Sequence, residues 1–449
     1  MAEGRKIMEA EKSKKIWQGW LRIREGVCLL VVLILFAGAK ISVLADGDIE
    51  ISTPDGLLEM AADPAGSYIL TDDIDMAGRE WPPFSFHGSL DGDGHAILNL
   101  SVKDTGEAVR DTYDGNMKVY ETSFAAMFDV LDGKVENLTL LNLQTDVETD
   151  RPCFAGSIAG YMENAVIADC QVEGTLTLRA HEKMFGVGGI AGYGYGQIDG
   201  CSADVTLVCI DTDSQTRDEQ FMGGVCGAGY PDVTNCNIRI DGYASEHGYA
   251  HNGGLIGMYI LYPRGTVYAG AVTGNQVDGK ITFYEDNTNR RAYCAPYIGE
   301  IMNWTFAYAE NKESFRRDEV YAYEVDLLPM RIRYPRADYP EQYICRHTSE
   351  KQDIMVPDCE TFGYTLHTCG DCGYSWKDTY TLRQHEYEWK VEKEPHLGET
   401  GLRQGICTRC GARKAEEMDA LQVEDIADQL EEFVRSTLDI LLPQWSGSF

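Results

Sequence analysis

The residues best suited to chemistry are cysteines and histidines near the C-terminus, which recur in two copies 38 residues apart. Each copy follows the spacing His-x11-Cys-x9-Cys-x2-Cys, except that Leu397 replaces the first cysteine of the second copy. The predicted ligands are His347, Cys359, Cys369 and Cys372 in the first copy and His385, Cys407 and Cys410 in the second, with His396 as the substitute beside Leu397. Three thiolates and one imidazole are the four ligands of a closed tetrahedral zinc site. The pattern therefore predicts structural Zn²⁺ that leaves no position for a substrate.

Disulfides are the alternative to zinc in these two modules. A module of 38 residues buries too little apolar surface to fold alone and needs a cross-link. Outside the cell, disulfides supply that cross-link. However, the cysteines of a Cys-x2-Cys pair bridge each other poorly, and a disulfide gives the retained histidines no role. Zinc is the preferred prediction, while disulfides or free thiols stay open, and either role is structural.

A longer repeat upstream must provide the scaffold that carries these modules. Its clearest copy has Gly189-Ile190-Ala191-Gly192 followed by Gly200-Cys201, and six copies span 126–311. The second landmark falls at Leu138, Cys170, Cys201, Cys236, Asn275 and Asn311. The segments between landmarks are short, alternating and rich in β-branched residues, as strands and turns are. One turn of chain per repeat predicts a right-handed parallel β-helix, with Leu138, Cys170, Cys201 and Cys236 stacked in an inward ladder.

These repeats resemble known families. The segment 124–311 is similar to the GLUG-type repeat of secreted and surface bacterial proteins, which also occurs near the N-terminus of IgA-specific metallopeptidases. The string from Phe86 to Leu100 resembles one that bacterial surface β-helices carry in their first coils. The segment 345–415 resembles the Cys/His repeats of clostridial-type surface proteins. The resemblance implies a scaffold, because the GLUG-type repeat is not known as a catalytic unit.

Catalytic residues are hard to identify in the predicted β-helix. No carboxylate pair is expected to recur at equivalent positions of adjacent coils, and Asp91, Asp93 and His95 fit a tight turn better than a Ca²⁺ loop. The polar segment 103–123 is expected to be a loop projecting from one corner. Seven tyrosines are expected either to form a binding surface or to be half-buried aromatic residues of the strands. They are Tyr243, Tyr249, Tyr259, Tyr262, Tyr268, Tyr284 and Tyr293.

The net charge indicates which partners are excluded, and the two ends of the chain indicate where the protein is located. The formal net charge is -33, and no basic face follows residue 45, which excludes nucleic acid as a partner. Residues 1–45 have basic residues before the apolar run 27–36 and predict a signal peptide cleaved after Ala39 or Ala45, with a retained signal-anchor as the alternative. No integral membrane span is expected in the mature chain. An amphipathic helix is predicted over 416–442, packing on the protein itself or on a second copy.

Together these features predict a mainly β protein. Its expected parts are a signal peptide at 1–45, a β-helix at 46–328, a linker at 329–344, tandem Cys/His modules at 345–415 and a helix and tail at 416–449. The predicted function is that of a secreted or cell-surface, adhesin-like bacterial protein, non-catalytic, which binds a host or bacterial surface glycan or protein. The alternative is a glycan-active enzyme, a polysaccharide lyase or glycoside hydrolase, that uses the β-helix groove.

Overall fold

A computed structural model describes residues 47–114, 118–180, 184–211, 219–246, 249–260, 270–285, 292–302, 306–309, 324–326, 349–371, 373 and 375–422. The chain divides into two compact units, Met1–Asp48 and Ile49–Phe449, and the account below concerns the second. The predicted signal peptide and the linker at 329–344 lie outside the described residues, as do 423–449. The predicted C-terminal helix is wrong at its start, because the chain is still a strand at Met418. Among the described residues no helix is long and apolar enough to cross a membrane.

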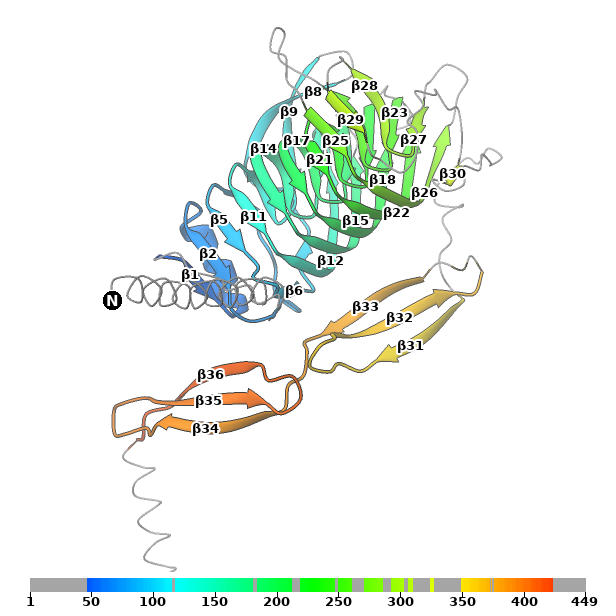
Figure 1. Cartoon of the computed structure of the whole chain (residues 1–449). Coiled ribbons are helices and arrows are strands. Elements are labelled where there is room, and N and C mark those ends of the chain that lie inside the picture. Colours follow the sequence, from blue (N-terminus) through cyan, green and yellow to red (C-terminus); the bar gives the residue numbers. More distant parts are fainter. Residues whose placement is uncertain are drawn as a thin grey trace, which may run out of the picture. The chain divides into compact units, whose positions relative to one another are not determined.

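The described chain is mainly β and forms long parallel sheets whose strands follow one another in sequence order (Figure 1). The first sheet contains β1 (Ile49–Ile51), β2 (Ser67–Leu70), β4 (Phe84–Phe86), β5 (Ser89–Asp91), β10 (Phe128–Leu131), β11 (Lys134–Glu136), β14 (Ala159–Ala168), β17 (Ala191–Asp199), β20 (Cys226–Gly229), β21 (Asp232–Thr234), β24 (Ile256–Ile260), β25 (Gly270–Thr273), β28 (Ile298–Met302) and β29 (Phe306–Ala309). Near its start, α2 (Pro54–Glu59) and η1 (Met60–Ala62) are the described helices, and the Thr53 hydroxyl caps α2.

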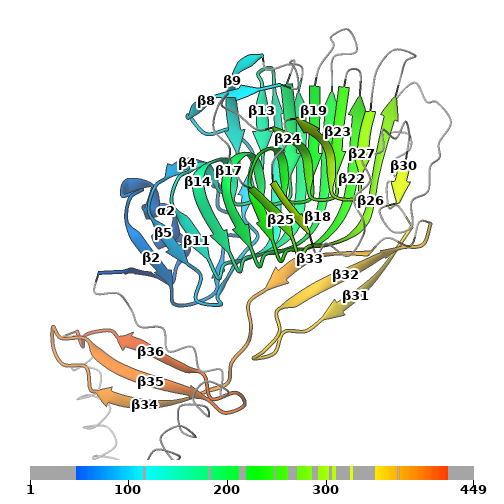
Figure 2. The same cartoon turned by 45° about the horizontal axis from the view of Figure 1, so that its top comes forward.

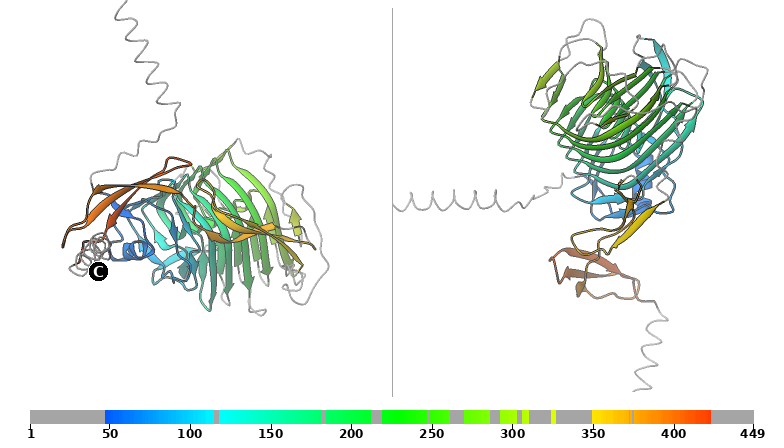
Figure 3. Two further views of the ribbon diagram at one scale, coloured as in Figure 1. Left: turned by 90° about the horizontal axis from the view of Figure 1, so that it is seen from below. Right: turned by 90° about the vertical axis from the view of Figure 1, so that its right-hand side faces the viewer.

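Two further sheets complete each coil, so that the chain visits the three sheets in turn. The second sheet contains β3 (Ile74–Asp75), β6 (Ala96–Leu98), β7 (Ser101–Val102), β12 (Thr139–Thr149), β15 (Gln171–Ala180), β18 (Ser202–Asp211), β22 (Asn237–Glu246), β26 (Gln276–Glu285) and β30 (Glu324–Asp326). The third contains β8 (Val109–Tyr113), β9 (Val119–Ala125), β13 (Cys153–Ala155), β16 (Met184–Gly188), β19 (Glu219–Gly223), β23 (Tyr249–Gly253) and β27 (Ala292–Ala295). The arrangement is β-helix-like, with successive rungs side by side in Figures 2 and 3.

Glycine at the first landmark of the repeat is required by the close approach of successive coils. A Cβ on Gly189 would lie 2.1 Å from the carbonyl oxygen of Gly224. A Cβ on Gly224 would lie 2.3 Å from the carbonyl oxygen of Gly254, one coil further on. Any larger residue at these corners would push neighbouring coils apart and break their hydrogen bonds.

The predicted ladder at the second landmark is present. Leu138, Cys170, Cys201 and Cys236 are all buried, and each one's carbonyl accepts a hydrogen bond from the first residue of the next coil's strand. The three thiols repeat one geometry, since each donates to a carbonyl of the preceding coil at 3.6–3.7 Å. Asn275 continues the ladder, where its carboxamide oxygen accepts from the backbone N–H of Cys236 at 2.9 Å. The ladder cysteines therefore serve as small buried core residues.

The segment 103–123 is not the projecting loop that its polar sequence predicts. Strands β8 and β9 form an antiparallel hairpin within it, and β9 pairs in parallel with β13. The hairpin thus ends the third sheet, with β8 at the edge (Figure 2). An antiparallel strand satisfies the backbone groups that the first parallel strand would otherwise leave unpaired.

One buried carboxylate ties this hairpin to the coils. Asp129 is only 2% exposed, and it accepts hydrogen bonds from the Ser85 hydroxyl at 2.8 Å and from the backbone N–H of Ala108 at 3.1 Å. Gly106 passes so close to Asp129 that a Cβ there would meet the carboxylate oxygen at 2.0 Å. The carboxylate therefore fixes the path of the chain between β7 and β8.

The C-terminal modules are two antiparallel sheets with equivalent strands. The first contains β31 (Glu350–Met355), β32 (Gly363–Cys369) and β33 (Ser375–Thr381), and the second contains β34 (Tyr387–Lys393), β35 (Gly401–Cys407) and β36 (Arg413–Met418). The central strands β32 and β35 have nearly the same pattern of burial, and each ends at a cysteine. In both modules a glycine with positive φ, Gly373 or Gly411, donates its N–H to the carbonyl of that cysteine.

Replacing Asp129 with alanine should destabilise the fold, because the buried N–H of Val130 and the half-buried donors of Ser85 and Ala108 lose their acceptor. Each buried donor left unpaired costs about 1–3 kcal/mol. We expect Asp129→Ala to lower the free energy of unfolding by about that amount, measured by urea denaturation followed by circular dichroism. Asp104→Ala, at an exposed position of the same segment, is the control and should change stability little. Equal stability of the two variants would contradict the role given to Asp129.

Candidate functional site

The structure gathers four of the predicted metal ligands in one place. The Sγ atoms of Cys359, Cys407 and Cys410 and a ring nitrogen of His385 all lie within 4.8 Å of one another. Cys407 ends β35, Cys410 lies in the turn that follows, and His385 precedes β34. Cys359 comes from the other module, in the turn before β32. This Cys₃His group has the donors and the spacing to hold a metal ion.

Local hydrogen bonds favour the thiolate form of Cys407, one member of this group. Backbone N–H groups of Cys410 and Arg409, with the His385 ring, lower the pKa of Cys407 to about 6. The Cys410 thiol lies 3.3 Å from Nδ1 of His385. Burial and the neighbouring Cys410 and Cys407 raise the pKa of Cys359. The thiolate is the form of cysteine that ligates metals.

The grouping differs from the one that the sequence spacing predicts. Cys359 lies with the ligands of the second module, whereas the prediction places it with Cys369. His396, the predicted substitute, is not in the group, and its backbone forms a bridge to Glu399 instead. Cys369 is buried at the end of β32, where its sulfur accepts a hydrogen bond from the N–H of Asp371 at 3.4 Å. His347 and Cys372 lie outside the described residues, so a metal site formed by these two residues with Cys369 stays a prediction.

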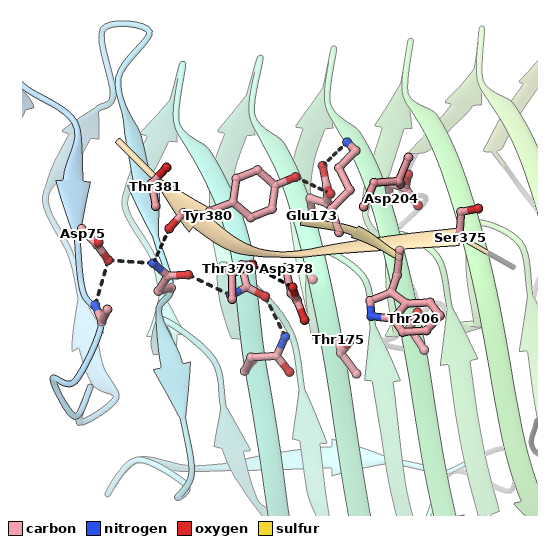
Figure 4. A pocket seen from close by; sticks show the side chains of 18 of the residues that line it. Asp75, Glu173, Thr175, Asp204, Thr206, Ser375, Asp378, Thr379, Tyr380 and Thr381 are labelled. Atoms are coloured by element: carbon pink, nitrogen blue, oxygen red, sulfur yellow. Dashed lines mark hydrogen bonds and ion pairs between the residues drawn. The ribbon is translucent and has the colours of Figure 1, made fainter. Parts of the chain in front are cut away.

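A second candidate site is a groove of about 850 Å³ between the outer face of the second sheet and strand β33. Its floor carries a row of polar side chains, because Gln144 pairs with Thr175 on the next coil and Thr175 pairs with Thr206 on the one after. Figure 4 shows β33 crossing the strands of this sheet, with Thr175 and Thr206 below it. The row therefore runs along the groove at the spacing of the coils.

The wall opposite this row is built by β33 and held by aromatic and charged neighbours. Trp376 lines the groove, and its ring stacks on that of His367 at 4.8 Å between centroids. The two ring nitrogens of His367 lie 2.7 Å from Asp378 and 3.1 Å from Glu350. Burial opposes the charged form of His367, but Asp378 and Glu350 outweigh it and raise its pKa. These contacts fix the indole in one orientation.

The wall is attached to the coils by an apolar contact with polar bonds around it. Tyr380 is 5% exposed and packs with Leu98 and Leu141 on the outer face of the second sheet. Its hydroxyl donates to Glu173 at 2.5 Å, and the Lys377 ammonium lies 3.1 Å from the other oxygen of that carboxylate (Figure 4). Burial and the neighbouring Glu173 raise the pKa of Tyr380, which keeps the hydroxyl a donor.

A partly buried ion pair completes the attachment. Arg383 donates to both oxygens of Asp73, with 2.8 Å for each bond. Burial by itself would raise the pKa of Asp73, whose side chain is 8% exposed. The hydrogen bonds from His95, Arg383 and the N–H of Ala96 outweigh burial and lower that pKa to about 2. A bidentate pair of this kind also fixes orientation.

Carboxylates do recur on adjacent coils, contrary to the sequence expectation. Glu173 and Asp204 are register partners on β15 and β18, and Arg239 follows them on β22. Burial and the charge of Glu173 raise the pKa of Asp204, against the effect of Arg239. Both oxygens of Glu173 are already bound by Tyr380 and Lys377. Both carboxylates therefore line the groove, and that of Glu173 is already held by Tyr380 and Lys377.

The other candidate residues have structural partners. The Asp91 carboxylate accepts from the N–H of Asp93 and from the Asn137 side chain, as a turn requires. Asp93 and Gly94 both have positive φ, so this segment is a tight turn. Of the seven tyrosines, Tyr243 and Tyr259 are buried and Tyr249 is half-buried, while the side chains of the other four lie outside the described set.

Comparisons with known proteins assign no family. No family model matches the chain, and neither does any curated protein. A solved structure of a "putative immunoglobulin A1 protease" from Bacteroides ovatus has a TM-score of 0.30 at 18% identity, covering 59% of this chain and 84% of that one. An "IgA1 Protease" structure has a TM-score of 0.35 at 13% identity, and the match covers 82% of this chain but only 34% of that one. At such low TM-scores neither similarity carries an argument about fold or activity.

The Asp73–Arg383 pair should make stability depend on pH below about 4. Because its pKa is about 2 in the fold and 3.8 ordinarily, Asp73 stabilises the fold above pH 4, and this contribution is lost as pH falls through 2. The contribution is on the order of 2 kcal/mol. Asp73→Asn should remove it, which urea denaturation between pH 2 and 6 would measure.

Asp72→Asn is the matched control, because the Asp72–Lys414 pair is solvent-exposed and contributes little. We expect the wild type and Asp72→Asn to lose stability in parallel as the pH falls. Asp73→Asn should have the shallower pH dependence. Identical pH profiles for all three proteins would contradict the role given to Asp73.

Proposed function

We propose that this is a secreted, non-catalytic cell-surface protein that binds a glycan chain in the groove beside β33. In this proposal the three sheets form a right-handed β-helix, and the first Cys/His module supplies the opposite wall of the groove. The observation that carries the proposal is the row formed by Gln144, Thr175 and Thr206 facing a wall that contains Trp376.

The geometry of the row favours an extended sugar chain over a peptide. Neighbouring strands lie about 4.8 Å apart, so the row offers a hydrogen-bonding group at each such step along the groove. A sugar chain also presents hydroxyl groups at a regular step, on both faces of the chain. An extended peptide repeats every 3.3 Å or so and turns alternate side chains away. An aromatic ring such as that of Trp376 adds an apolar face on which a sugar ring can pack.

The charges of the groove and of the whole chain indicate which class of glycan the groove could bind. Asp75, Glu173, Asp204 and Asp378 line the groove, against the basic residues Arg239 and Lys377. The chain as a whole has a formal net charge of -33. A strongly anionic polysaccharide would be repelled, so the proposed ligand is a neutral or basic glycan.

A glycan-active enzyme is the second candidate function. The specific observation in its favour is the pair Glu173 and Asp204 on adjacent coils, with the pKa of Asp204 raised. Paired carboxylates of unequal pKa are the machinery of glycoside hydrolysis. The bonds that hold Glu173 to Tyr380 and Lys377 favour binding without chemistry.

Zinc is the ion that we propose for the Cys₃His group, in a structural role. Three soft thiolates and one imidazole suit Zn²⁺, and four protein ligands close the coordination sphere. A module this small gains much of its folding free energy from such an ion.

The groove proposal predicts that Trp376→Ala weakens glycan binding at least tenfold. The mature chain 46–449 would be screened on glycan and host-protein arrays, and the best ligand then titrated by calorimetry. Trp389→Ala, which removes a half-exposed indole in the other module, is the matched control and should bind normally. The double variant Thr175→Ala/Thr206→Ala tests the floor without disturbing the stack on His367. Unchanged binding in both groove variants would overturn the proposal, and release of shortened glycan by the wild type would establish the enzyme instead.

The zinc proposal predicts that the native protein contains stoichiometric zinc bound by the Cys₃His group. Removal of the ion with a chelator should disorder the second module, because binding and folding are coupled. Elemental analysis and native mass spectrometry measure the metal, and NMR dispersion measures the order. Defined disulfides among Cys359, Cys407 and Cys410 in a metal-free secreted protein would overturn the proposal.

A further inference from the structure

We infer that the metal site is a clasp between the two modules, in which the first cysteine of one module completes the site of the module that follows it. The inference rests on the zinc proposed above. It goes further in assigning the fourth ligand across the module boundary and in assigning the ion a mechanical role.

The geometry of the ligands supports this division. His385, Cys407 and Cys410 belong to the second module, and Cys359 is the member that reaches them from the first. The turn that carries Cys359 is held by Asp358, whose carboxylate accepts from the N–H groups of Glu360 and Thr361 at 2.8 and 2.7 Å. The same turn is tied to the connection between the modules.

This tie is a backbone bond across the boundary. The carbonyl of Asp358 accepts from the N–H of Gln384 at 2.9 Å, so Cys359 sits beside the residue that precedes His385. On the far side, the carbonyl of Glu386 accepts from the N–H of Thr408 at 2.9 Å, next to Cys407. The ligands are thus placed by short local bonds from both modules, which gives a preformed site.

The sequence spacing gains a simple explanation from this arrangement. The spacing His385-x21-Cys407-x2-Cys410 recurs as His347-x21-Cys369-x2-Cys372, so three ligand positions are shared by the two modules. The fourth ligand, Cys359, lies 26 residues before His385. Its repeat equivalent is Leu397, an exposed residue that cannot bind a metal, so the second module has no fourth ligand of its own at this position.

The clasp has a mechanical consequence. Without the ion, the backbone bond that the described residues show across the boundary is the one from the N–H of Gln384 to the carbonyl of Asp358. A single hydrogen bond of this kind stabilises by only about 1 kcal/mol. A tetrahedral ion with ligands from both sides would hold β34–β36 in a fixed position relative to β31–β33.

The test uses the full mature chain loaded with Co²⁺ as a spectroscopic probe and with Zn²⁺. Cys359→Ser should lower the sulfur-to-cobalt charge-transfer absorption of this site by about one third, because one of three thiolates is lost. It should also weaken Zn²⁺ binding at least tenfold. Amide hydrogen exchange at 382–386 should become faster in this variant even when Zn²⁺ saturates the remaining ligands. His396→Ala should match the wild type in all three measurements.

A relocation variant separates the clasp from a site contained within one module. In Cys359→Ser/Leu397→Cys the thiol is moved to the equivalent position of the second module. The clasp requires that this variant stay as weak as Cys359→Ser. Restored absorption and affinity would overturn the clasp while leaving zinc binding intact, whereas absence of Co²⁺ binding by the wild type would overturn the zinc proposal itself.

Discussion

Hydrogen bonding between successive coils is the interaction on which the structure depends. Parallel strands direct their N–H and C=O groups along the stack, so each coil is satisfied only by its neighbours. This demand explains the glycine corners, where Gly189 and Gly224 leave no room for a Cβ. It also explains the two antiparallel strands at sheet edges, since β8 closes one sheet on β9 and β30 pairs with β26 in another. The edges of a parallel stack need a different kind of strand from its interior.

The interior of the stack could be predicted from sequence better than its edges. Buried positions such as Cys170 and Cys201 repeat in one register, and a repeated landmark carries that information directly. The segment 103–123 has no such landmark, and its charges suggested a loop. In the structure β8 faces solvent with every second residue, and Thr112 and Thr122 form a buried hydroxyl pair across the hairpin. A half-exposed edge hairpin and a polar loop have similar compositions, which is why sequence alone did not separate them.

The candidate sites were harder to predict, because they depend on which residues the fold brings together. Glu173 and Asp204 lie opposite each other although coil lengths vary and a register shift falls between Leu141 and Leu143 one coil earlier. Such shifts are invisible in a sequence repeat. The cysteine spacing shows a different difficulty, since a periodic sequence can be divided into units at any point. Dividing it at the histidine places Cys359 with Cys369, whereas the folded unit places it with His385.

Docking of the first module combines an apolar contact with charges that set its orientation. Tyr380 against Leu98 and Leu141 supplies buried area, and the bidentate pair of Arg383 with the partly buried Asp73 fixes the orientation of the module. Strand β33, which walls the groove, ends at Thr381. Residues 381–385 therefore join the groove wall, the docking ion pair and the first ligand of the metal group within one short stretch of backbone. Any displacement of this stretch changes all three, so the groove has its shape only when the module is docked.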